Sequence, residues 1–406
     1  MTMKADRKVA TRRIKDLAAR FNRASKAVRI PYRHRLMYWI SYIRLARRGV
    51  MVHSATRDAQ YEDGTHKRRY DKYCEKINER LCRAPAPPGP VEMPSFEHGE
   101  LEIEGLQLLM RLNVPFVIRN GAQALPVKNW SLDYIEEVAG TCKVPINEAG
   151  DSPASDLSRP TKAHHYYEFR TGTVAEVVAS IRNGGNMRIS TAEDVMHHDN
   201  GRLRKDLDLP YWEQVSGWVR NRHHWWRSRL LVGKVVGAQL MMQPPNAFTL
   251  WHAEPGDNFF VLAKGEKTWT LAHPYYSAAM HPRVKRTTNY HGSNIDVRES
   301  DDVQIQRGFA GYLNVPKLRL TMQSGDVLRV PNNWWHTVVT HPGHYTLAAT
   351  IRANGMLNML GPGYALLRWI DPQYLAIAKS FAKDDRIYDT HIGYPRRPRE
   401  AAEEQA

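Results

Sequence analysis

The sequence has few cysteines and no long apolar run. Its three cysteines, Cys74, Cys82 and Cys142, are odd in number and lie outside any CxxC pair, which argues against a disulfide framework and against thiolate metal ligands. No stretch approaches the roughly 18 apolar residues of a transmembrane helix, and the basic N-terminus lacks the apolar centre of a secretory signal. These absences predict a cytoplasmic protein without a transmembrane segment.

Acidic residues are scarce at the start of the chain. Residues 1–85 contain 23 Lys and Arg against 8 Asp and Glu, so this region carries nearly all of the formal net charge of +16. Two stretches have apolar residues at helical spacing and are predicted to be amphipathic helices: Leu36, Trp39, Ile40 and Ile43 in the first, and Tyr70, Tyr73, Ile77 and Leu81 in the second. A proline-rich linker over 84–90 then ends a basic helical arm, residues 1–90.

Three interpretations of this arm follow from its composition. It binds nucleic acid through phosphate contacts, lies on an anionic membrane surface, or docks its apolar faces on the rest of the chain with Lys and Arg pointing outward. Because both predicted helices have an apolar face, docking is favoured. An acidic substrate or partner would still be attracted to the outward charges, and its affinity would then fall with added salt.

The rest of the chain is typical of a globular enzyme. With 406 residues and 42% hydrophobic content, the chain can bury a large core, so one main domain is expected over residues 91–355. Apolar residues over 357–370 predict helices within the last segment, residues 356–406. By analogy, these C-terminal helices support the main domain or build a homodimer.

The clearest chemistry lies in Thr249–Glu254. Period-two alternation along this predicted strand points His252 and Glu254 to the same side. Far downstream, a second strand begins at Val327, passes a Pro-Asn-Asn break and is closed by His336. Two imidazoles and one carboxylate suit Fe(II), and such a set leaves positions open for a co-substrate and dioxygen. By itself, however, an HxE triplet arises easily in a chain with 18 histidines.

The surrounding residues extend this pattern. Asn258 follows His252 by six residues, an apolar strand over 259–262 leads to a turn that ends at Lys267, and two tryptophans precede His336. Together these motifs resemble the JmjC and cupin-type (cupin-like) 2-oxoglutarate oxygenases, most closely the branch of the asparaginyl hydroxylase of the hypoxia-inducible factor. The resemblance covers roughly residues 100–355 and includes an entry motif at 113–122.

The resemblance implies a mainly β fold with helical extensions (α+β), built on a double-stranded β-helix or jelly-roll barrel. It also implies that His252, Glu254 and His336 bind Fe(II), while Lys267, Thr249 and Asn258 hold 2-oxoglutarate. A compact ammonium suits the distal carboxylate of the keto acid. Asn258 either donates to the co-substrate or satisfies the loop backbone. The implied reaction uses O2 to hydroxylate an unactivated C–H bond and releases succinate and CO2.

The substrate and the exact reaction class stay open. Glu254 departs from the Asp of the asparaginyl hydroxylase branch and agrees with many JmjC demethylases, so N-demethylation of a protein or nucleic acid is one alternative. A carboxylate here excludes a halide site, and with it halogenation. The second alternative is a non-catalytic cupin that binds nucleic acid or protein through its arm. The expected substrate is a small molecule, an amino acid or a peptide.

Other motifs predict supporting structure. Thr173 and Glu176 form a capping box at the start of a helix. The adjacent histidines within 222–227 diverge on any regular element, so a surface or substrate-rim position is favoured over metal ligation. After the distal histidine, the pattern assigns no role to either Thr350 or Arg352.

Overall fold

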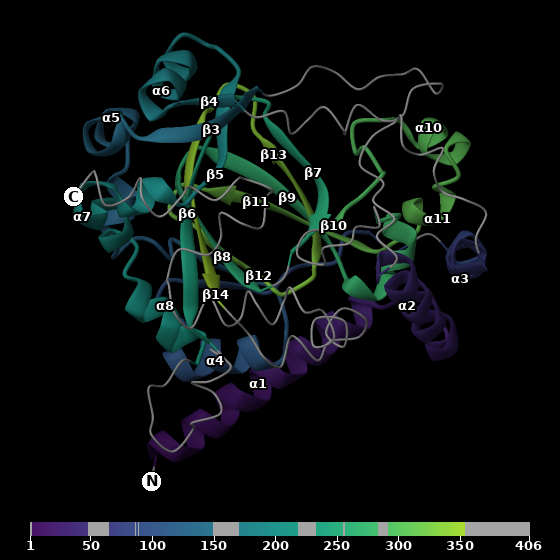
Figure 1. Cartoon of the computed structure of the whole chain (residues 1–406). Helices are drawn as coiled ribbons and strands as arrows, with labels where there is room; N and C mark the ends of the chain where they lie inside the picture. The colour runs from purple at the N-terminus through teal and green to yellow at the C-terminus, as the bar shows by residue number, and fades with distance from the viewer. Residues whose placement is uncertain are drawn as a thin grey trace.

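The computed structural model describes residues 2–47, 65–85, 87, 89–148, 170–217, 233–254, 256–282 and 291–353. Within these ranges two β-sheets form a jelly-roll barrel, and helices cover the outer sides of the sheets (Figure 1). The predicted fold class is therefore confirmed. The C-terminal helices predicted after residue 356 and the histidine pair within 222–227 lie outside the described residues.

The larger sheet has nine strands in the order β1-β2-β12-β8-β14-β6-β5-β3-β4. The β1–β2 pair is parallel and the other neighbouring pairs are antiparallel. Its strands are β1 Ser95–Glu97, β2 Phe116–Arg119, β3 Lys143–Glu148, β4 Arg170–Thr173, β5 Met187–Ala192, β6 Val235–Gln243, β8 Asp257–Lys264, β12 Val327–Val330 and β14 Thr346–Ala353.

The smaller sheet has five antiparallel strands in the order β10-β7-β13-β9-β11. They are β7 Phe248–Ala253, β9 Glu266–Ala272, β10 His291–Gly292, β11 Lys317–Gln323 and β13 Trp335–Thr340. The turn from β8 to β9 lies at Gly265, whose φ of +92° and close approach to the Tyr345 carbonyl exclude a side chain. This turn carries the chain from the larger sheet into the smaller one.

Alternating side chains give each sheet an inner and an outer face. Phe260 on β8 and Trp269 on β9 belong to one buried cluster that lies between the sheets. Phe259, next to Phe260, belongs instead to the cluster on the outer side of the larger sheet. The inner face is where the candidate site residues of both sheets meet.

Helices cover the outer face of the larger sheet and share its largest apolar cluster. They are α4 Ile103–Arg111, α5 Leu132–Ala139, α6 Val174–Arg182, α7 Asp194–Lys205 and α8 Leu209–Val215, with a short 3-10 helix, η2, at Pro126–Asn129. The predicted capping box is confirmed at α6, where Thr173 and Glu176 satisfy each other's backbone N–H groups.

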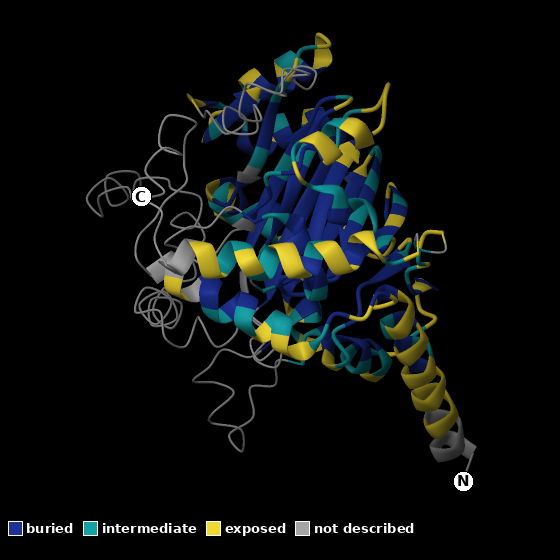
Figure 2. Ribbon diagram, turned by 90° about the vertical axis from the view of Figure 1, so that its right-hand side faces the viewer, coloured by how far each residue is buried: buried dark blue, intermediate teal, exposed yellow. Residues whose placement is uncertain are grey.

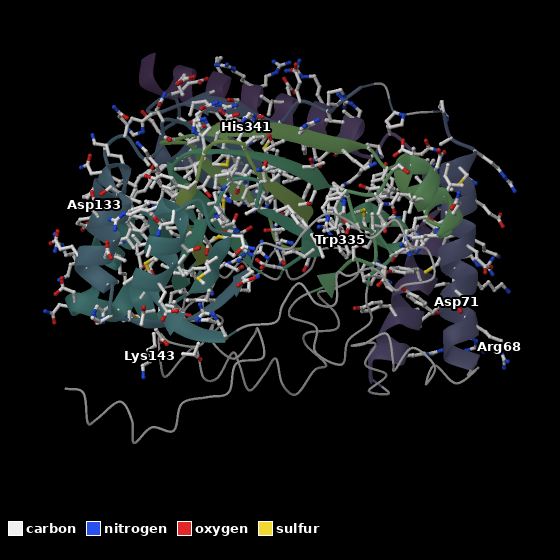
Figure 3. The ribbon with its side chains drawn as sticks, turned by 90° about the horizontal axis from the view of Figure 1, so that it is seen from above. Arg68, Asp71, Asp133, Lys143, Trp335 and His341 are labelled. Carbon is white, nitrogen blue, oxygen red and sulfur yellow. The ribbon has the colours of Figure 1, made fainter. Side chains whose placement is uncertain are left out.

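Three N-terminal helices pack against the barrel: α1 Thr2–Ser25, α2 Tyr32–Arg47 and α3 Thr65–Cys82. The aromatic face of α2 and the end of α3 share an apolar cluster with Trp251 and Trp335 from the outer face of the smaller sheet. Figure 3 shows Trp335 on the side of the barrel that faces α2 and α3. The remaining elements beside this cluster are η5 Pro274–Met280, α10 Asp301–Gln306 and α11 Ala310–Leu313.

Two details of the arm differ from the sequence prediction. Leu36, placed in the apolar stripe of the first helix, is 41% exposed, because Tyr38, Trp39 and Tyr42 form the buried face instead. Helix α1 was not predicted at all. Its buried residues Ile14 and Phe21 lie two turns apart, a signal that the dense Lys and Arg around them obscures.

The position of His336 also corrects the prediction. The strand that starts at Val327 ends at Val330, and His336 is the second residue of a new strand, β13. The break between them contains Asn333 in the left-handed region, with φ +62°. Because β12 belongs to the larger sheet and β13 to the smaller one, this turn moves the chain across the barrel. Among the described helices, none is long and apolar enough to cross a bilayer.

Candidate metal centre

His252 and His336 face each other across the β7–β13 ladder, where they form a register pair. Their ring centroids are 4.0 Å apart. Nδ1 of His252 lies 2.8 Å from the Leu250 carbonyl, and Nδ1 of His336 lies 2.9 Å from the Trp334 carbonyl. These contacts fix the rings and leave Nε2 of each histidine as the atom available to a metal.

Glu254 follows the end of β7 and completes a group of three. Its Oε1 lies 3.7 Å from His252 Nε2, and one ligand atom from each of the three residues falls within 4.8 Å of the others. The Asn333 N–H donates to the Glu254 carbonyl over 2.8 Å, so the turn before β13 holds the residue in place. The three residues that the sequence singled out are therefore brought together.

Charges around this group favour the protonation state that a metal needs. Burial would raise the pKa of Glu254, but Arg352 and the two histidines outweigh it and lower the pKa to about 2. Burial, together with the neighbouring His252, lowers the pKa of His336 to about 3, and burial also lowers the pKa of His252. At neutral pH the site thus offers two neutral imidazoles and one carboxylate.

Arg352 is the close neighbour that the sequence left without a role. It lies on β14 and forms an ion pair with Oε2 of Glu254. Thr350, the other residue left open, shares the inner face but donates to Gln239 over 3.3 Å instead. Only the pairing of β14 with β8 and β6 reveals which of the two reaches the metal centre.

A buried lysine lies further along the same interior. Lys267 is 1% exposed, and its Nζ donates to Gln243 and, over 3.2 Å, to Thr340. No Asp or Glu pairs with it in the described ranges. Burial, and then the positive charge of Arg188, lower the pKa of Lys267 to about 7. This cluster is suited to an anionic ligand, which would supply the missing negative charge.

Arg188 is a second cation that sequence reasoning missed. It lies on β5, is 1% exposed, and donates to the Phe248 carbonyl over 2.7 Å. The neighbouring Ala247 carbonyl accepts from the Thr340 N–H over 2.7 Å, so Arg188 and the Lys267 cluster meet at the start of β7. A single arginine in a short strand gave no signal of this convergence.

Thr249 reaches the inner face through an irregularity of β7. His336 pairs with His252, and Val338 pairs with Thr249. The two pairs are therefore two residues apart on β13 but three residues apart on β7. The extra residue is a bulge that places Thr249 on the same face as His252, although strict alternation would separate them. The residue is half-buried, and its carbonyl accepts from the Thr337 hydroxyl over 2.6 Å.

Asn258 lies on β8 directly opposite Arg352 in the β8–β14 ladder. It is 3% exposed, and its Oδ1 has no hydrogen-bond partner among the described residues. It therefore lies within a strand and not in the loop that the sequence suggested as one option. A buried amide oxygen without a partner beside the candidate metal centre points to a hydrogen-bond donor, such as a bound water, that the described residues do not supply.

A jelly-roll barrel with a His-Glu-His group on its inner face defines a cupin-type protein with a candidate metal-binding site. The chain belongs to the family with a cupin-like domain, whose model matches residues 104–357. It is also similar to JmjC domain-containing protein D of Dictyostelium discoideum, with 23% identity over 232 residues, or 55% of this chain and 48% of that protein. The chain thus spans about half the length of this relative. Family and site together support an oxygenase-type function, and the asparaginyl hydroxylase branch stays a prediction.

Proposed function

We propose that this protein is an Fe(II)- and 2-oxoglutarate-dependent dioxygenase that hydroxylates a C–H bond of a small molecule, an amino acid or a peptide. One observation carries the proposal: two features lie in the same barrel interior. The first is the group of His252, Glu254 and His336, and the second is Lys267, which is buried without a carboxylate partner among the described residues. The first suits a divalent metal and the second suits a dicarboxylate.

His252 and His336 bind iron through Nε2, because backbone carbonyls occupy the Nδ1 side of both rings. Glu254 binds through a carboxylate that Arg352 keeps ionised. The ring of Trp269 stacks on His336 with centroids 5.5 Å apart, which restricts rotation of that ligand and excludes water from one side of it. With iron and 2-oxoglutarate bound, the site would use O2 to oxidise a C–H bond of the substrate, and succinate and CO2 would be released.

Lys267 and Arg188 bind the distal carboxylate of 2-oxoglutarate, assisted by the hydroxyls of Thr249 and Thr340. Both cations are buried, so a carboxylate between them gains strong electrostatic stabilisation and relieves their mutual repulsion. Asn258 supports the other end of the keto acid beside the metal by donating from its Nδ2–H, while its Oδ1 can accept only from a donor such as a bound water. The Nε1 of Trp269, buried without a partner among the described residues, is a further donor in this interior.

The proposal is tested by adding Fe(II) and 2-oxoglutarate without oxygen and recording the visible absorption of the iron–keto acid chelate. A band is expected in the natural protein and is expected to weaken in Glu254→Ala and in Lys267→Ala. Lys264→Ala, which removes an exposed lysine at the turn before Lys267, is the matched control and should keep the band. A folded protein that gives no band would favour the non-catalytic binding module.

The reaction class is separated by its products. Succinate without formaldehyde is expected once a substrate is present, because hydroxylation at an ordinary carbon leaves the product intact. Formaldehyde formed in the same amount as succinate would instead identify an N-demethylase, which is the alternative that the glutamate at position 254 leaves open.

A further inference from the structure

The N-terminal helices concentrate positive charge on the outside of the molecule. Residues 8–35 contain ten Lys and Arg and one acidic residue, Asp16. Arg13 pairs with Glu100 at 3.5 Å, and it is the single basic residue of α1 with a carboxylate partner in the described part of the chain. The other cations of this segment therefore have little protein charge to balance them.

Helix α1 turns its apolar face to the barrel and its basic face outward. Ile14, Ala18 and Phe21 are buried, and Phe21 lies 5.9 Å from Trp334 between ring centroids. Figure 2 shows the outer side of this helix exposed along most of its length. The exposed basic face consists of Lys8, Arg12, Lys15, Arg20 and Arg23. From Lys8 to Arg23 it extends for about 22 Å.

A second basic group lies where α1 leads into α2 and where α3 packs against α2. We call it the basic junction; its exposed members are Lys26, Arg29, Arg33, Lys76 and Arg80. The Nε of Arg80 donates to the Arg29 carbonyl over 2.9 Å, which ties α3 to the segment before α2. Burial and the nearby charges of Lys76, Arg80 and Arg33 lower the pKa of His34, as expected inside a cluster of cations.

An aromatic side chain stands within this basic junction. Tyr32, the first residue of α2, is 67% exposed, which is unusual for a large ring. The guanidinium of Arg35 lies 5.6 Å from its ring centroid. Exposed aromatic rings among arginines suit nucleic acids, since a base stacks on the ring while its phosphates meet the cations.

The charges and the ring together favour one class of partner. We propose that the basic face of α1 and the basic junction form a binding surface for single-stranded nucleic acid, with phosphates on the Lys and Arg side chains and a base stacked on Tyr32. A membrane fits less well, because the apolar face of α1 that would enter lipid is already buried against the barrel. The carboxylates of an acidic peptide would meet the cations but would leave the Tyr32 ring without a stacking partner, whereas every nucleotide carries both a phosphate and a base.

The test uses the full chain and fluorescein-labelled single-stranded RNA and DNA oligonucleotides, with binding measured by fluorescence anisotropy at several salt concentrations. The variant Arg29→Gln/Arg33→Gln/Lys76→Gln removes three charges and leaves the Arg80 hydrogen bond intact. It should weaken binding at least about tenfold and reduce the slope of log affinity against log salt by about 2. Comparing RNA with DNA identifies which sugar is preferred.

Two further variants separate this surface from general charge. Tyr32→Ala should weaken binding about tenfold and leave the salt slope unchanged, because stacking carries no ionic charge. The control Lys143→Gln/Lys205→Gln/Arg319→Gln removes three exposed charges from the barrel and its helices; Figure 3 shows Lys143 on the side of the molecule opposite α3. It should bind as the natural protein does.

Three results would overturn the proposal. The first is that neither oligonucleotide binds, and the second is that the control variant loses as much affinity as the basic-junction variant. The third is that phosphatidylserine vesicles bind as tightly as the oligonucleotides and that Tyr32→Ala does not weaken oligonucleotide binding. Because no metal or co-substrate is needed, the outcome is independent of the proposed oxygenase activity.

Discussion

Arg352 forms an ion pair with Glu254 and thereby links the larger sheet to the end of β7 at the candidate metal centre. The side chains of Arg352 and Glu254 are only 5% and 18% exposed, so solvent screens the pair weakly. Removing either partner leaves the other charge buried without compensation. Because Arg352 offsets the negative charge of Glu254, the same pair also determines how strongly the site attracts a metal cation.

We therefore expect Arg352→Met to destabilise the metal-free protein by about 3 kcal/mol, near the lower end for a broken buried pair because Glu254 is partly exposed. A bound divalent metal replaces the lost positive charge. Adding Mn(II) should thus raise the midpoint of thermal unfolding more in this variant than in the natural protein. Calorimetry with and without the metal measures both effects.

The matched control is Thr350→Val, which changes a neighbour on the same strand face that contacts Gln239 and not Glu254. It should leave the metal-induced rise in the unfolding midpoint unchanged. If Arg352→Met also showed the natural rise, the ion pair would have no bearing on metal binding.

Lys267 gives a prediction for pH dependence. Its pKa is lowered to about 7, chiefly by burial, so above that pH the empty protein loses the ammonium that an anion requires. The apparent affinity for 2-oxoglutarate should fall by up to about tenfold per pH unit above about pH 7. The pKa values of His252 and His336 are lowered too, so the histidines do not titrate in this range. Titration calorimetry of the Mn(II)-loaded protein should also detect proton uptake on binding.

Lys267→Arg is the informative control, because a guanidinium stays charged at every accessible pH. It should bind 2-oxoglutarate with an affinity that does not change with pH, even if the larger group weakens binding. A flat pH profile in the natural protein would contradict the assignment of Lys267 to the anion.

The grouping of His252, Glu254 and His336 could be predicted from the sequence because it depends on local spacing. His252 and Glu254 are two residues apart near the end of a strand, and the motif around His336 is contiguous. The remaining contacts depend on strand pairing. Arg352 and Arg188 reach the interior from strands far away in the chain, and no local pattern records which residues will lie opposite them.

Thr249 shows how a local rule fails even within a correctly predicted strand. Alternation alone would turn its side chain away from His252, and the bulge in β7 reverses that outcome. The resemblance assigned Thr249 to the site, whereas the residue pattern did not. The fold class was predictable for a similar reason, since the barrel follows from several motifs together and not from the periodicity of one strand.

Asn258 tests whether an unsatisfied polar group marks a ligand. Its buried Oδ1 has no partner among the described residues, so Asn258→Leu removes an uncompensated polar atom at little change in volume. The free energy of unfolding should change by less than about 1 kcal/mol, while loss of the Nδ2–H donor should lower the affinity for 2-oxoglutarate about tenfold. Urea unfolding and titration calorimetry measure the two quantities. Unchanged affinity would instead make Asn258 a packing residue of β8.

Phe21 connects the N-terminal helix to the metal centre. Its ring packs on Trp334, whose carbonyl lies 2.9 Å from Nδ1 of His336. Phe21→Ala should lower the free energy of unfolding by about 3–5 kcal/mol, because it leaves a cavity between α1 and the barrel core. Arg20→Ala, at the exposed neighbouring position, should change it by less than about 0.5 kcal/mol. Urea unfolding followed by tryptophan fluorescence compares the two variants. Equal, small effects would show that α1 is dispensable for the barrel, whereas the expected difference would show that docking of the helix through Phe21 stabilises the barrel wall that contains Trp334 and His336.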